Sequence, residues 1–387
     1  MNLPKRLLTV SHSYVVAQNR CLAHEIAQAG KGNWEIRTIA PRFMKGDLRH
    51  IQFEELTNDQ SNAQTVNYYW SRYPHVMMCG LELKRILSEP WDLVHVWEEP
   101  FVLSGAQTAW WKPKTAKLIF ASFQNIEKKY PPPFCWFERY TVNRCDGWIS
   151  YGQTSHQTLS SRPGYADKSS TIIPVGVDVE SFYPDKAIGL AVRKKLGWTD
   201  STACPVIGFL GRFVPEKGIS LIMRILDQLN SAWRALFVGG GPMETELKRW
   251  GAQKGDRVRV ITGVPHDLVN GYLNAMDVML APSQTTPRWK EQFGRMIIEA
   301  FAAGVPVIGS DSGEIPYVIR DSGMVVGEND EDGWVRELTE LLESPSRRLE
   351  LRDRSIQRAH KEFTWRVVAE KHLHFFKRII DMKKRDS

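Results

Sequence analysis

The sequence predicts an α/β protein with two Rossmann-like domains, whose parallel sheets face each other across a cleft. Its length of 387 residues is enough for two domains. Short apolar runs bounded by polar, Gly or Pro residues alternate with longer helical patterns, which is typical of βαβ units. One series of such runs ends near Pro184 and a second begins after Pro205. We therefore expect domains at 1–184 and 185–364, followed by a C-terminal segment at 365–387.

The apolar runs predict the strands of both domains. In the first domain they occupy residues 7–10, 35–40, 93–96, 118–121, 147–151 and 171–174. In the second domain they occupy residues 206–210, 235–238, 258–261, 278–281, 305–309 and 324–326. The helical patterns between the second set of runs cover residues 219–230, 243–254, 267–275, 295–303 and 330–342. Ligands of such sheets bind at the carboxyl ends of the strands, so functional residues are expected in the loops that follow these runs.

The last segment predicts an amphipathic helix over residues 365–384. Its apolar residues recur near helical spacing: Val367, Val368, Leu373, Phe376 and Ile380. We expect this helix to cross back and pack on the first domain.

The charge balance argues against a nucleic-acid-binding domain. The formal net charge is +7, and the excess of Lys and Arg is divided about equally between residues 1–182 and the rest. A nucleic-acid partner needs a concentrated basic stripe, whereas a mild excess suits anionic small molecules or an anionic membrane surface. We therefore expect no nucleic-acid partner, and we keep open a peripheral contact with the inner membrane surface.

Neither a targeting segment nor a metal site is predicted. The apolar run near the start of the sequence is too short for a signal peptide. No window approaches the ~18 uncharged apolar residues of a membrane span. We therefore expect a cytoplasmic protein. The cysteines contain no C-x-x-C pair, so we expect reduced thiols and no zinc: Cys21, Cys79, Cys135, Cys145 and Cys204. No Asp-x-Asp motif stands at a strand end, so we expect activity without a metal.

Residues 291–308 form the most specific motif. Glu291 is expected in a loop, Gly294 precedes an apolar helix, and Glu299 lies on that helix. Gly294 lets a ligand approach the backbone, and the free N–H groups of the first helical turn make an anion site. Carboxylates accept hydrogen bonds from the vicinal hydroxyls of a sugar or a ribose. The motif thus offers a sugar clamp, a phosphate site and a ribose clamp. The alternative is a surface helix with two solvated glutamates.

Two cations follow the strand predicted at 206–210. The strand ends at Gly211, and Arg212 and Lys217 stand between it and the next helix. Two cations at the carboxyl end of a strand can neutralise a diphosphate leaving group. The alternative is a pair of exposed loop cations.

A glycine run, Gly239-Gly240-Gly241, follows the strand predicted at 235–238. It lacks the spaced third glycine of a dinucleotide fingerprint. We interpret it as a tight turn into a helix, with Pro242 at the first helical position.

Together these motifs resemble glycosyltransferase family 4, the group 1 glycosyltransferases, which are retaining enzymes of the GT-B fold. The resemblance covers roughly residues 204–330. It rests on four stretches: Gly211-Arg212…Lys217-Gly218, Val238 through Pro242, Asp277-Val278…Pro282-Ser283, and Glu291 through Pro306. It implies a nucleoside diphosphate sugar as the donor substrate and no cofactor.

The resemblance also implies roles for single residues. Arg212 and Lys217 would grip the donor diphosphate, while Glu291 would contact sugar hydroxyls and Glu299 would hold the ribose. Arg212, Lys217 and Glu291 are therefore the candidate catalytic residues. The other donor-binding candidates would shape the turns or meet the sugar, phosphate and base through the backbone: Gly211, Gly239, Val264, Phe293, Gly294, Arg295 and Met296.

The first half departs from the family in two places. Many members have a Gly-Gly loop after the first strand, but residues 11–17 contain no glycine. Many also have a histidine after the strand at 118–121, where this chain has Phe123-Gln124-Asn125. Glutamine cannot act as a base, although it can hydrogen-bond a hydroxyl. His95 stands inside a predicted strand, and we interpret it as a core residue.

Acceptor recognition is expected in the first domain, because the donor uses the strand-end loops of the second. The candidates are the polar groups that follow predicted strands: Ser13, Tyr14, Glu98, Glu99, Gln124 and Asn125. The alternative is that they only cap strand ends and turns. The stretch 130–138, rich in proline and aromatic residues, either lines an acceptor pocket or packs on its own domain.

The implied reaction moves a sugar from a nucleoside diphosphate sugar to a glycan or lipid-linked acceptor hydroxyl, with retention. It would serve the synthesis of a polysaccharide, glycolipid or cell-surface glycan. Two alternatives stay open. One is another GT-B activity, such as that of a nucleotide-sugar epimerase or a phosphorylase. A catalytically silent nucleotide-sugar-binding partner of a glycan assembly system would account for the missing histidine and glycines.

Overall fold

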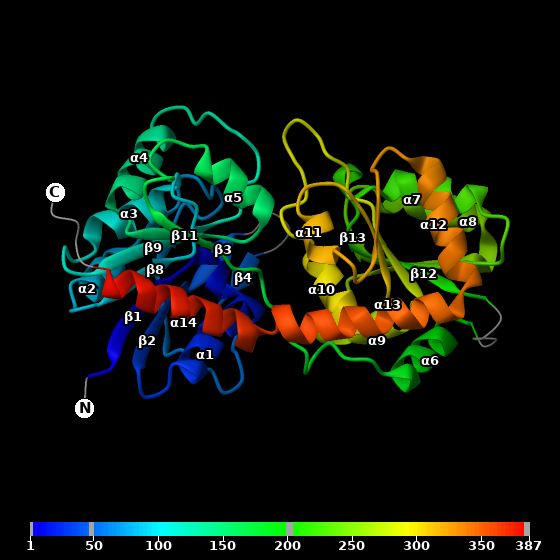
Figure 1. The fold of residues 1–387 in the computed structure, drawn as a ribbon, viewed down its shortest axis with the longest axis horizontal. Helices are drawn as coiled ribbons and strands as arrows, with labels where there is room; N and C mark the ends of the chain where they lie inside the picture. The colour runs from blue at the N-terminus through cyan, green and yellow to red at the C-terminus, as the bar shows by residue number, and fades with distance from the viewer. Residues whose placement is uncertain (1–2, 46–49, 199–203, 383–387) are drawn as a thin grey trace. The chain divides into compact units, whose positions relative to one another are not determined.

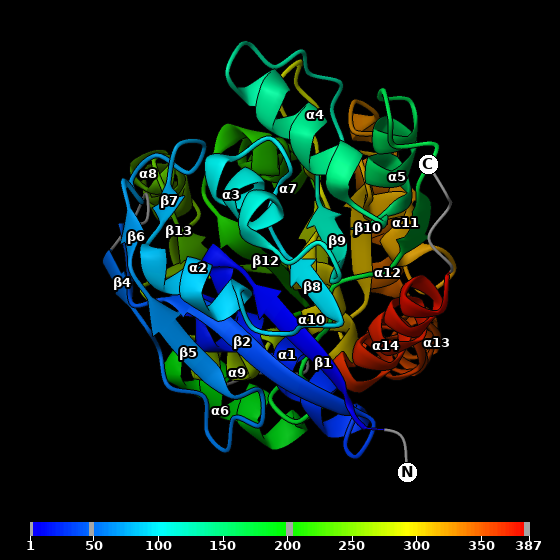
Figure 2. The same cartoon turned by 90° about the vertical axis from the view of Figure 1, so that its left-hand side faces the viewer.

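The computed structural model describes residues 3–45, 50–198 and 204–382, and it divides into two compact units. Unit 1 comprises Met1–Gly176 and Trp365–Ser387, and unit 2 comprises Val177–Thr364. Figures 1 and 2 show that each unit is a sheet covered by helices.

The described part of unit 1 contains a seven-stranded parallel sheet in the order β11-β10-β9-β8-β1-β2-β5. Its strands are β1 (Lys5–Val10), β2 (Trp34–Pro41), β5 (Ala63–Val66), β8 (Leu93–Val96), β9 (Lys117–Ser122), β10 (Gly147–Ser150) and β11 (Ser169–Ile172). The strand order reverses at β1, whose neighbours are β2 and β8. The carboxyl ends of β1 and β8 therefore border the switch point, where open α/β sheets bind ligands.

The apolar runs predicted these strands except β5, and they also missed the short strands near it. These are β3 (Phe43–Lys45), β4 (His50–Gln52), β6 (Tyr68–Tyr69) and β7 (Met78–Cys79), which form two antiparallel pairs. Strands this short carry too few residues for their periodicity to be read. The helices of unit 1 are η1 (His12–Val15), α1 (Ala17–Ala29), α2 (Leu81–Leu87), α3 (Leu103–Trp111), α4 (Phe134–Arg144), α5 (Gln153–Ser160) and α14 (Trp365–Asp381).

The described part of unit 2 contains a six-stranded parallel sheet in the order β14-β13-β12-β15-β16-β17. Its strands are β12 (Val206–Arg212), β13 (Arg234–Gly240), β14 (Val258–Thr262), β15 (Val278–Ala281), β16 (Val307–Ser310) and β17 (Met324–Val326). Each lies where an apolar run predicts it. Here the strand order reverses between β12 and β15, so their carboxyl ends border a second switch point.

The helices of unit 2 include a match for each of the five helical patterns predicted there. They are α6 (Lys186–Lys195), α7 (Ile219–Gln228), α8 (Glu244–Gln253), α9 (Val269–Asn274), α10 (Arg295–Ala302), α11 (Ile315–Ile319), α12 (Glu331–Glu343) and α13 (Pro345–Arg358). The sequence analysis did not predict α6, α11 or α13. It also placed Pro242 at the first helical position, which is wrong, because α8 begins at Glu244. The Met243 amide donates instead to the Phe213 carbonyl at 3.0 Å, which extends the turn.

Unit 1 ends at Gly176 rather than at the expected residue 184. From Val177 onward the chain packs with unit 2, where the Val177 amide donates to the Phe363 carbonyl at 2.7 Å. Val177 also forms a parallel bridge with Thr364. The segments that leave and re-enter unit 1 therefore run side by side.

Helix α14 belongs to unit 1 and lies beside α1 (Figure 1). Gly147 of β10 permits its close approach, because a Cβ there would lie 2.8 Å from Cδ1 of Ile379. The Phe376 ring packs against the His95 ring, with 5.2 Å between centroids. The helix ends at Asp381, and the last residues of the predicted helix lie outside the described residues.

Two histidines are buried where α14 meets the sheet. His95 of β8 and His372 of α14 are both fully buried, with ring centroids 5.8 Å apart. Nδ1 of His95 lies 3.0 Å from the Thr9 hydroxyl, and Nδ1 of His372 lies 2.8 Å from the Val368 carbonyl. Neither Nε2 has a partner among the described residues. Burial lowers the pKa of both, that of His372 to about 4. His95 is thus a core residue, as its place inside a strand predicts.

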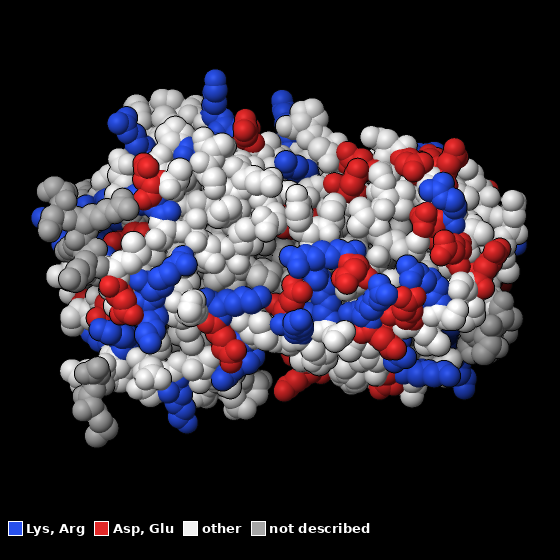
Figure 3. Space-filling model, in the orientation of Figure 1, with Lys and Arg blue, Asp and Glu red and all other residues white. Residues whose placement is uncertain are grey.

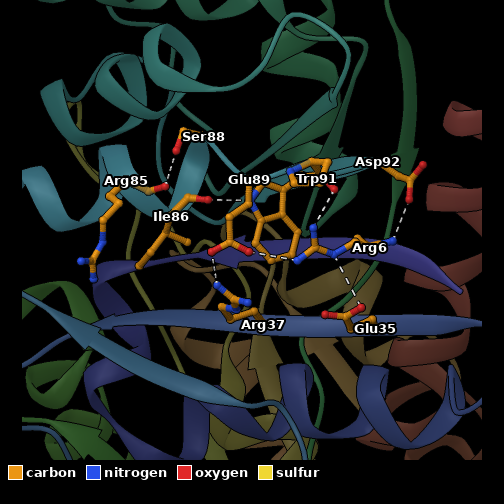
Figure 4. Close-up of polar contacts among 10 residues, drawn as sticks. Arg6, Glu35, Arg37, Arg85, Ile86, Ser88, Glu89, Trp91 and Asp92 are labelled. Atoms are coloured by element: carbon orange, nitrogen blue, oxygen red, sulfur yellow. Dashed lines mark hydrogen bonds and ion pairs between the residues drawn. The ribbon is translucent and has the colours of Figure 1, made fainter.

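A cluster of charged side chains links neighbouring strands near the amino ends of the strands of the same sheet (Figure 4). Glu89 accepts hydrogen bonds from Arg6 of β1 at 3.0 Å and from Arg37 of β2 at 2.6 Å. Both guanidinium groups also lie over the Trp91 ring, at 4.5 and 5.0 Å. Burial would raise the pKa of Glu89, but the two arginines outweigh it and lower that pKa. The cluster lies at the edge opposite the switch point, so it stabilises the sheet and leaves the carboxyl ends to ligands.

Candidate functional site

The candidate donor site lies at the switch point of unit 2. The short helix η2 (Pro215–Lys217) follows β12, and the loop 282–294 connects β15 to α10. Because β12 and β15 are adjacent parallel strands, their carboxyl ends bring these two segments together. The sequence predicted candidates on both segments.

Lys217 and Glu291 form the central contact. The Lys217 Nζ lies 2.5 Å from the Glu291 Oε2, which also accepts a hydrogen bond from the Ser283 hydroxyl at 2.8 Å. The side chains are only 11% and 8% exposed. The Trp289 ring centroid lies 5.5 Å from the same Nζ. Removing one partner of such a pair leaves a buried charge uncompensated, so the two residues depend on each other.

Helix α10 begins directly after this loop. Its cap, Gly294, has a φ of 83°, and a Cβ there would lie 2.9 Å from Cδ1 of Ile297. That conformation favours glycine. The helix therefore starts at Arg295, and the positive end of its dipole is placed next to the Lys217–Glu291 pair. Phe293 and Met296, the neighbouring candidates, are buried.

Glu299 lies on the same helix and is buried, at 7% exposure. Its Oε1 lies 3.6 Å from Nε2 of His266, whose side chain is half exposed. His266 and the candidate Val264 belong to the segment that follows β14. The Glu299 carboxylate is therefore buried but has an exposed neighbour, which suits a ligand arriving from that side.

The remaining donor candidates lie where β12 and β13 end. Gly211 pairs with Gly239, and a Cβ on Gly239 would lie 1.8 Å from the Gly211 carbonyl oxygen. Arg212 ends β12 and is exposed. Its side chain makes no hydrogen bond or ion pair within the described part of the chain. A glycine edge beside an exposed guanidinium leaves room for a phosphate.

In unit 1 the acceptor-side candidates mostly hold the loops in place. Tyr14 is fully buried, and its hydroxyl lies 2.8 Å from the Thr9 hydroxyl. Ser13 is tied to Ser11, whose hydroxyl accepts the Ser13 amide at 3.1 Å. Tyr14 is thus placed in the core, because its ring packs edge-on against Trp97 at 5.5 Å.

The acceptor-side candidates near the end of β9 also make hydrogen bonds that hold their own loops in place. Glu99 accepts hydrogen bonds from the Ser122 hydroxyl at 2.5 Å and from the Phe123 amide at 2.8 Å. Burial raises the pKa of Glu99 to about 7, although these hydrogen bonds oppose the shift. The Gln124 side-chain amide donates to the Ile126 carbonyl, and Asn125 is buried. These contacts favour the capping interpretation for Glu99 and Gln124.

Glu98 has a different partner, which the sequence analysis did not single out. Its Oε2 lies 2.7 Å from Nδ1 of His12, and its Oε1 accepts the His12 amide at 2.7 Å. The Glu98 side chain is 1% exposed, whereas that of His12 is 37% exposed. Burial alone would lower the pKa of His12, but the Glu98 carboxylate outweighs it and raises that pKa. A histidine after one strand and a glutamate after the neighbouring strand were the signal that could have revealed this pair.

The described residues contain no group of three or more His, Cys, Asp or Glu side chains placed to hold a metal ion. None of the helices described is both long and apolar enough to cross a membrane.

Solved structures identify the architecture. A glycosyltransferase from Rickettsia africae gives a TM-score of 0.76, covering 99% of this chain and 100% of that chain at 17% identity. HepE from Anabaena, solved with UDP and glucose, gives a TM-score of 0.72. The match covers 97% of this chain and 100% of that chain, at 16% identity. These likenesses confirm the predicted fold class, the two-domain α/β architecture of GT-B glycosyltransferases.

A family model matches a segment of the chain that belongs to unit 2. Residues 196–362 match the family model "Glycosyl transferases group 1". This segment contains Lys217, Glu291 and Glu299. Residues 196–362 thus resemble a group 1 glycosyltransferase segment, as the motifs of the sequence predict.

Two curated relatives are similar over part of the chain. One is a GDP-mannose-dependent monoacylated alpha-(1-6)-phosphatidylinositol monomannoside mannosyltransferase from Corynebacterium glutamicum, 33% identical over 51% of this chain and 54% of its own length. The other is a D-inositol 3-phosphate glycosyltransferase from Stackebrandtia nassauensis, 33% identical over 62% of this chain and 56% of its own length. The chain thus spans about half the length of the relatives it matches.

Proposed function

We propose that this chain transfers a sugar from a nucleoside diphosphate sugar to an acceptor hydroxyl, with retention at the reacting carbon. The observation that carries the proposal is the buried Lys217–Glu291 pair beside the N-terminus of α10. Lys217, Arg212 and that helix end would stabilise the charge on the departing diphosphate. Glu291 would accept hydrogen bonds from the sugar and Glu299 from the ribose.

Retention rests on the resemblance rather than on a placed nucleophile. A double displacement needs a carboxylate at the reacting carbon. Glu291 is already bound to Lys217 and Ser283, so we assign it to binding. Departure and attack on the same face of the sugar is the route that these residues support.

The names of the relatives support the substrate classes. The relative from Corynebacterium is named for GDP-mannose and a phosphatidylinositol mannoside, and HepE was solved with UDP and glucose. We propose by analogy a nucleotide-sugar donor and a glycan or lipid-linked acceptor, in glycan or glycolipid synthesis. We further propose that no cofactor or metal takes part in the transfer.

Thermal shifts with a panel of UDP- and GDP-sugars test the proposal first, because a bound ligand raises the apparent stability. Product analysis in excess EDTA, with and without acceptor alcohols, then follows the donor that binds. Transfer, or slow donor hydrolysis, supports the proposed function. A rearranged donor sugar would indicate an epimerase, and binding without any turnover would indicate a silent partner. Activity that EDTA abolishes and Mg²⁺ restores would contradict metal independence.

Glu299→Ala should weaken donor binding by roughly 10- to 100-fold, because hydrogen bonds to a charged group contribute about 1.5–3 kcal/mol. Titration calorimetry with the donor measures the loss. Glu246→Ala, on the exposed face of α8 in the same unit, is the control and should bind normally. A folded Glu299→Ala variant with unchanged affinity would remove Glu299 from the site.

We propose that unit 1 contacts an anionic membrane surface through α4. Trp136, Arg139, Tyr140 and Asn143 form an exposed stripe at helical spacing on this helix, and Trp136 is 64% exposed. Exposed Lys128 and Lys129 precede the helix. Aromatic rings flanked by cations suit the interface of an anionic bilayer.

Binding to vesicles tests this surface. Trp136→Ala/Tyr140→Ala should reduce cosedimentation with vesicles of phosphatidylglycerol severalfold, while the wild-type protein should not bind vesicles of phosphatidylcholine alone. Tyr317→Ala, an exposed tyrosine on α11 of unit 2, is the control. Equal binding by all three proteins would contradict the assignment.

A nucleic-acid partner is not proposed. Lys and Arg side chains gather over α13, but Asp and Glu side chains lie among them (Figure 3). Glu350 pairs with both Arg347 and Arg354, at 2.6 and 2.5 Å, and Arg358 pairs with Glu362 at 3.0 Å. A surface that neutralises itself in this way lacks the uninterrupted basic stripe that nucleic acid requires.

A further inference from the structure

The described residues of unit 2 surround a cavity of about 740 Å³ at the edge of the sheet opposite the switch point. Pro205, Asp277 and Pro306 line it, and they immediately precede β12, β15 and β16. Helices α6, α9 and α13 also contribute to its wall and lie together on this side of the unit (Figure 1). Every lining residue belongs to unit 2, so the cavity is complete within one unit and is separate from the candidate donor site. Its volume is typical of a small-molecule site.

The lining carries an excess of positive charge. It contains four cations and two acids: Lys186, Arg193, Arg348, Arg352, Asp185 and Asp277. Asp277 already accepts hydrogen bonds from the Arg193 guanidinium at 2.8 Å and from the Val206 amide at 2.7 Å. Asp185 already caps the first turn of α6. The other three cations pair with no acid in the part of the chain that the structure describes. The cavity is therefore suited to an anion.

Two of these cations lie one turn apart on α13. The Arg348 Nη1 donates to the carbonyls of Leu341 and Leu342, which holds this side chain in place. Arg352 lies against Gly304, where a Cβ would be 3.1 Å from its Nε. The Arg352 guanidinium is partly exposed and makes no hydrogen bond or ion pair within the described ranges. The two arginines are thus positioned at the cavity while donors remain available to a ligand.

Apolar side chains border the same cavity. Leu190 of α6 is 40% exposed and Leu349 of α13 is 55% exposed, and both belong to the lining. The buried side chain of Met276 also belongs to it. Single exposed leucines are common on protein surfaces, but here two of them border one cavity beside unpaired cations. A ligand with an apolar group next to its negative charge would cover these leucines.

We propose that this cavity binds a phosphate monoester whose phosphate is held by Lys186, Arg348 and Arg352 and whose ester group is apolar. A guanidinium binds phosphate oxygens through paired hydrogen bonds, and a lysine adds a point charge. A phosphate monoester carries about 1.5 to 2 negative charges near neutral pH, which matches a cluster of unpaired cations. The ester group packs against Leu190 and Leu349, which inorganic phosphate would leave uncovered. The site is independent of the proposed sugar transfer.

NMR of the Met276 methyl group tests the site directly, because this residue lines the cavity. Hexyl phosphate should cause a saturable shift of the signal, which Met276→Leu assigns. Lys186→Ala/Arg352→Ala should weaken the affinity by about 10-fold or more, because each variant side chain loses a hydrogen bond to a charged group. Arg354→Ala is the matched control on α13. Arg354 pairs with Glu350 at 2.5 Å and does not line the cavity, so this variant should bind normally.

Two further probes define the ligand class. Inorganic phosphate and glycerol 3-phosphate should both bind about 10-fold more weakly than hexyl phosphate, because neither brings an apolar group to the leucines. Arg212→Ala should leave the Met276 shift unchanged, since Arg212 lies at the opposite edge of the sheet. Arg352 also lies beside the carboxyl end of α10, where a cation stabilises a helix, so the double variant can lose stability. Lys186→Ala alone changes an exposed side chain and should still weaken binding severalfold.

Four results would overturn the proposal. The first is the absence of a saturable Met276 shift with hexyl phosphate. The second is wild-type affinity in Lys186→Ala and in the folded double variant. The third is equal affinity for the three phosphates, which would exclude the apolar part of the ligand. The fourth is a Met276 shift that Arg212→Ala abolishes, which would place the phosphate at the other edge of the sheet.

Discussion

Replacing Lys217 by alanine is expected to slow sugar transfer by about 30- to 1000-fold, equivalent to roughly 2–4 kcal/mol of transition-state stabilisation. The ammonium is 11% exposed and lies at the switch point of unit 2. There it faces a ligand with little competing water, so its attraction for a developing charge is strong. The ratio of kcat/KM between wild type and variant, with the donor found in the binding panel, measures the loss.

The control must separate chemistry from folding, because Lys217→Ala leaves Glu291 buried without its partner. Lys217→Ala/Glu291→Gln removes that charge, so it should regain thermal stability and remain slow. Lys248→Ala removes a lysine whose partner Glu244 is on the surface, and it should behave as wild type. Wild-type turnover in a folded Lys217→Ala variant would exclude Lys217 from the diphosphate site.

Acidification is expected to destabilise the protein through the buried histidines His95 and His372. The unfolded chain binds a proton on each near pH 6.5, whereas burial keeps both neutral in the fold and lowers the pKa of His372 to about 4. The free energy of unfolding is therefore undiminished above pH 6.5 and falls as pH drops toward 4. For His372 alone the loss amounts to ~3 kcal/mol.

Urea titrations between pH 7.5 and pH 4.5 measure this dependence. His372→Gln should flatten it, whatever the variant costs in stability at neutral pH. His374→Gln, an exposed position on the same helix, should leave the slope unchanged. A His372→Gln protein with the full wild-type slope would show that other groups cause the acid sensitivity.

The strands and helices that carry the proposed donor residues could be predicted from sequence, because each of these motifs is local. A strand end, a glycine and a helix start follow one another in residues 206–218 and 278–302, so the chain order already gives the order in space. The direct contact between Lys217 and Glu291 was not predicted. It joins residues far apart in the sequence through the pairing of β12 with β15, which only the folded sheet reveals.

The acceptor side illustrates the opposite case. Tyr14 and Glu98 were predicted to bind the acceptor because they are polar residues that follow strands. In the structure Tyr14 is buried in the core, and Glu98 is hydrogen-bonded to His12. His12 and Glu98 are brought together by the pairing of β1 with β8, and although each residue follows a strand, its position does not by itself indicate the other as its partner. The short strands at 43–79 were missed for a related reason, since they depend on neighbours rather than on their own apolar periodicity.

Because α14 belongs to unit 1 but follows unit 2 in the sequence, the two segments of unit 1 are synthesised at different times, one before unit 2 and one after it. The strands of the first sheet leave the ribosome before unit 2, but the helix that covers His95 leaves only after the whole of unit 2. Domains generally fold as they emerge, so unit 2 can be complete while unit 1 still exposes an apolar face. A nascent or prematurely terminated chain would thus display that face to chaperones and proteases, although unit 2 is already formed.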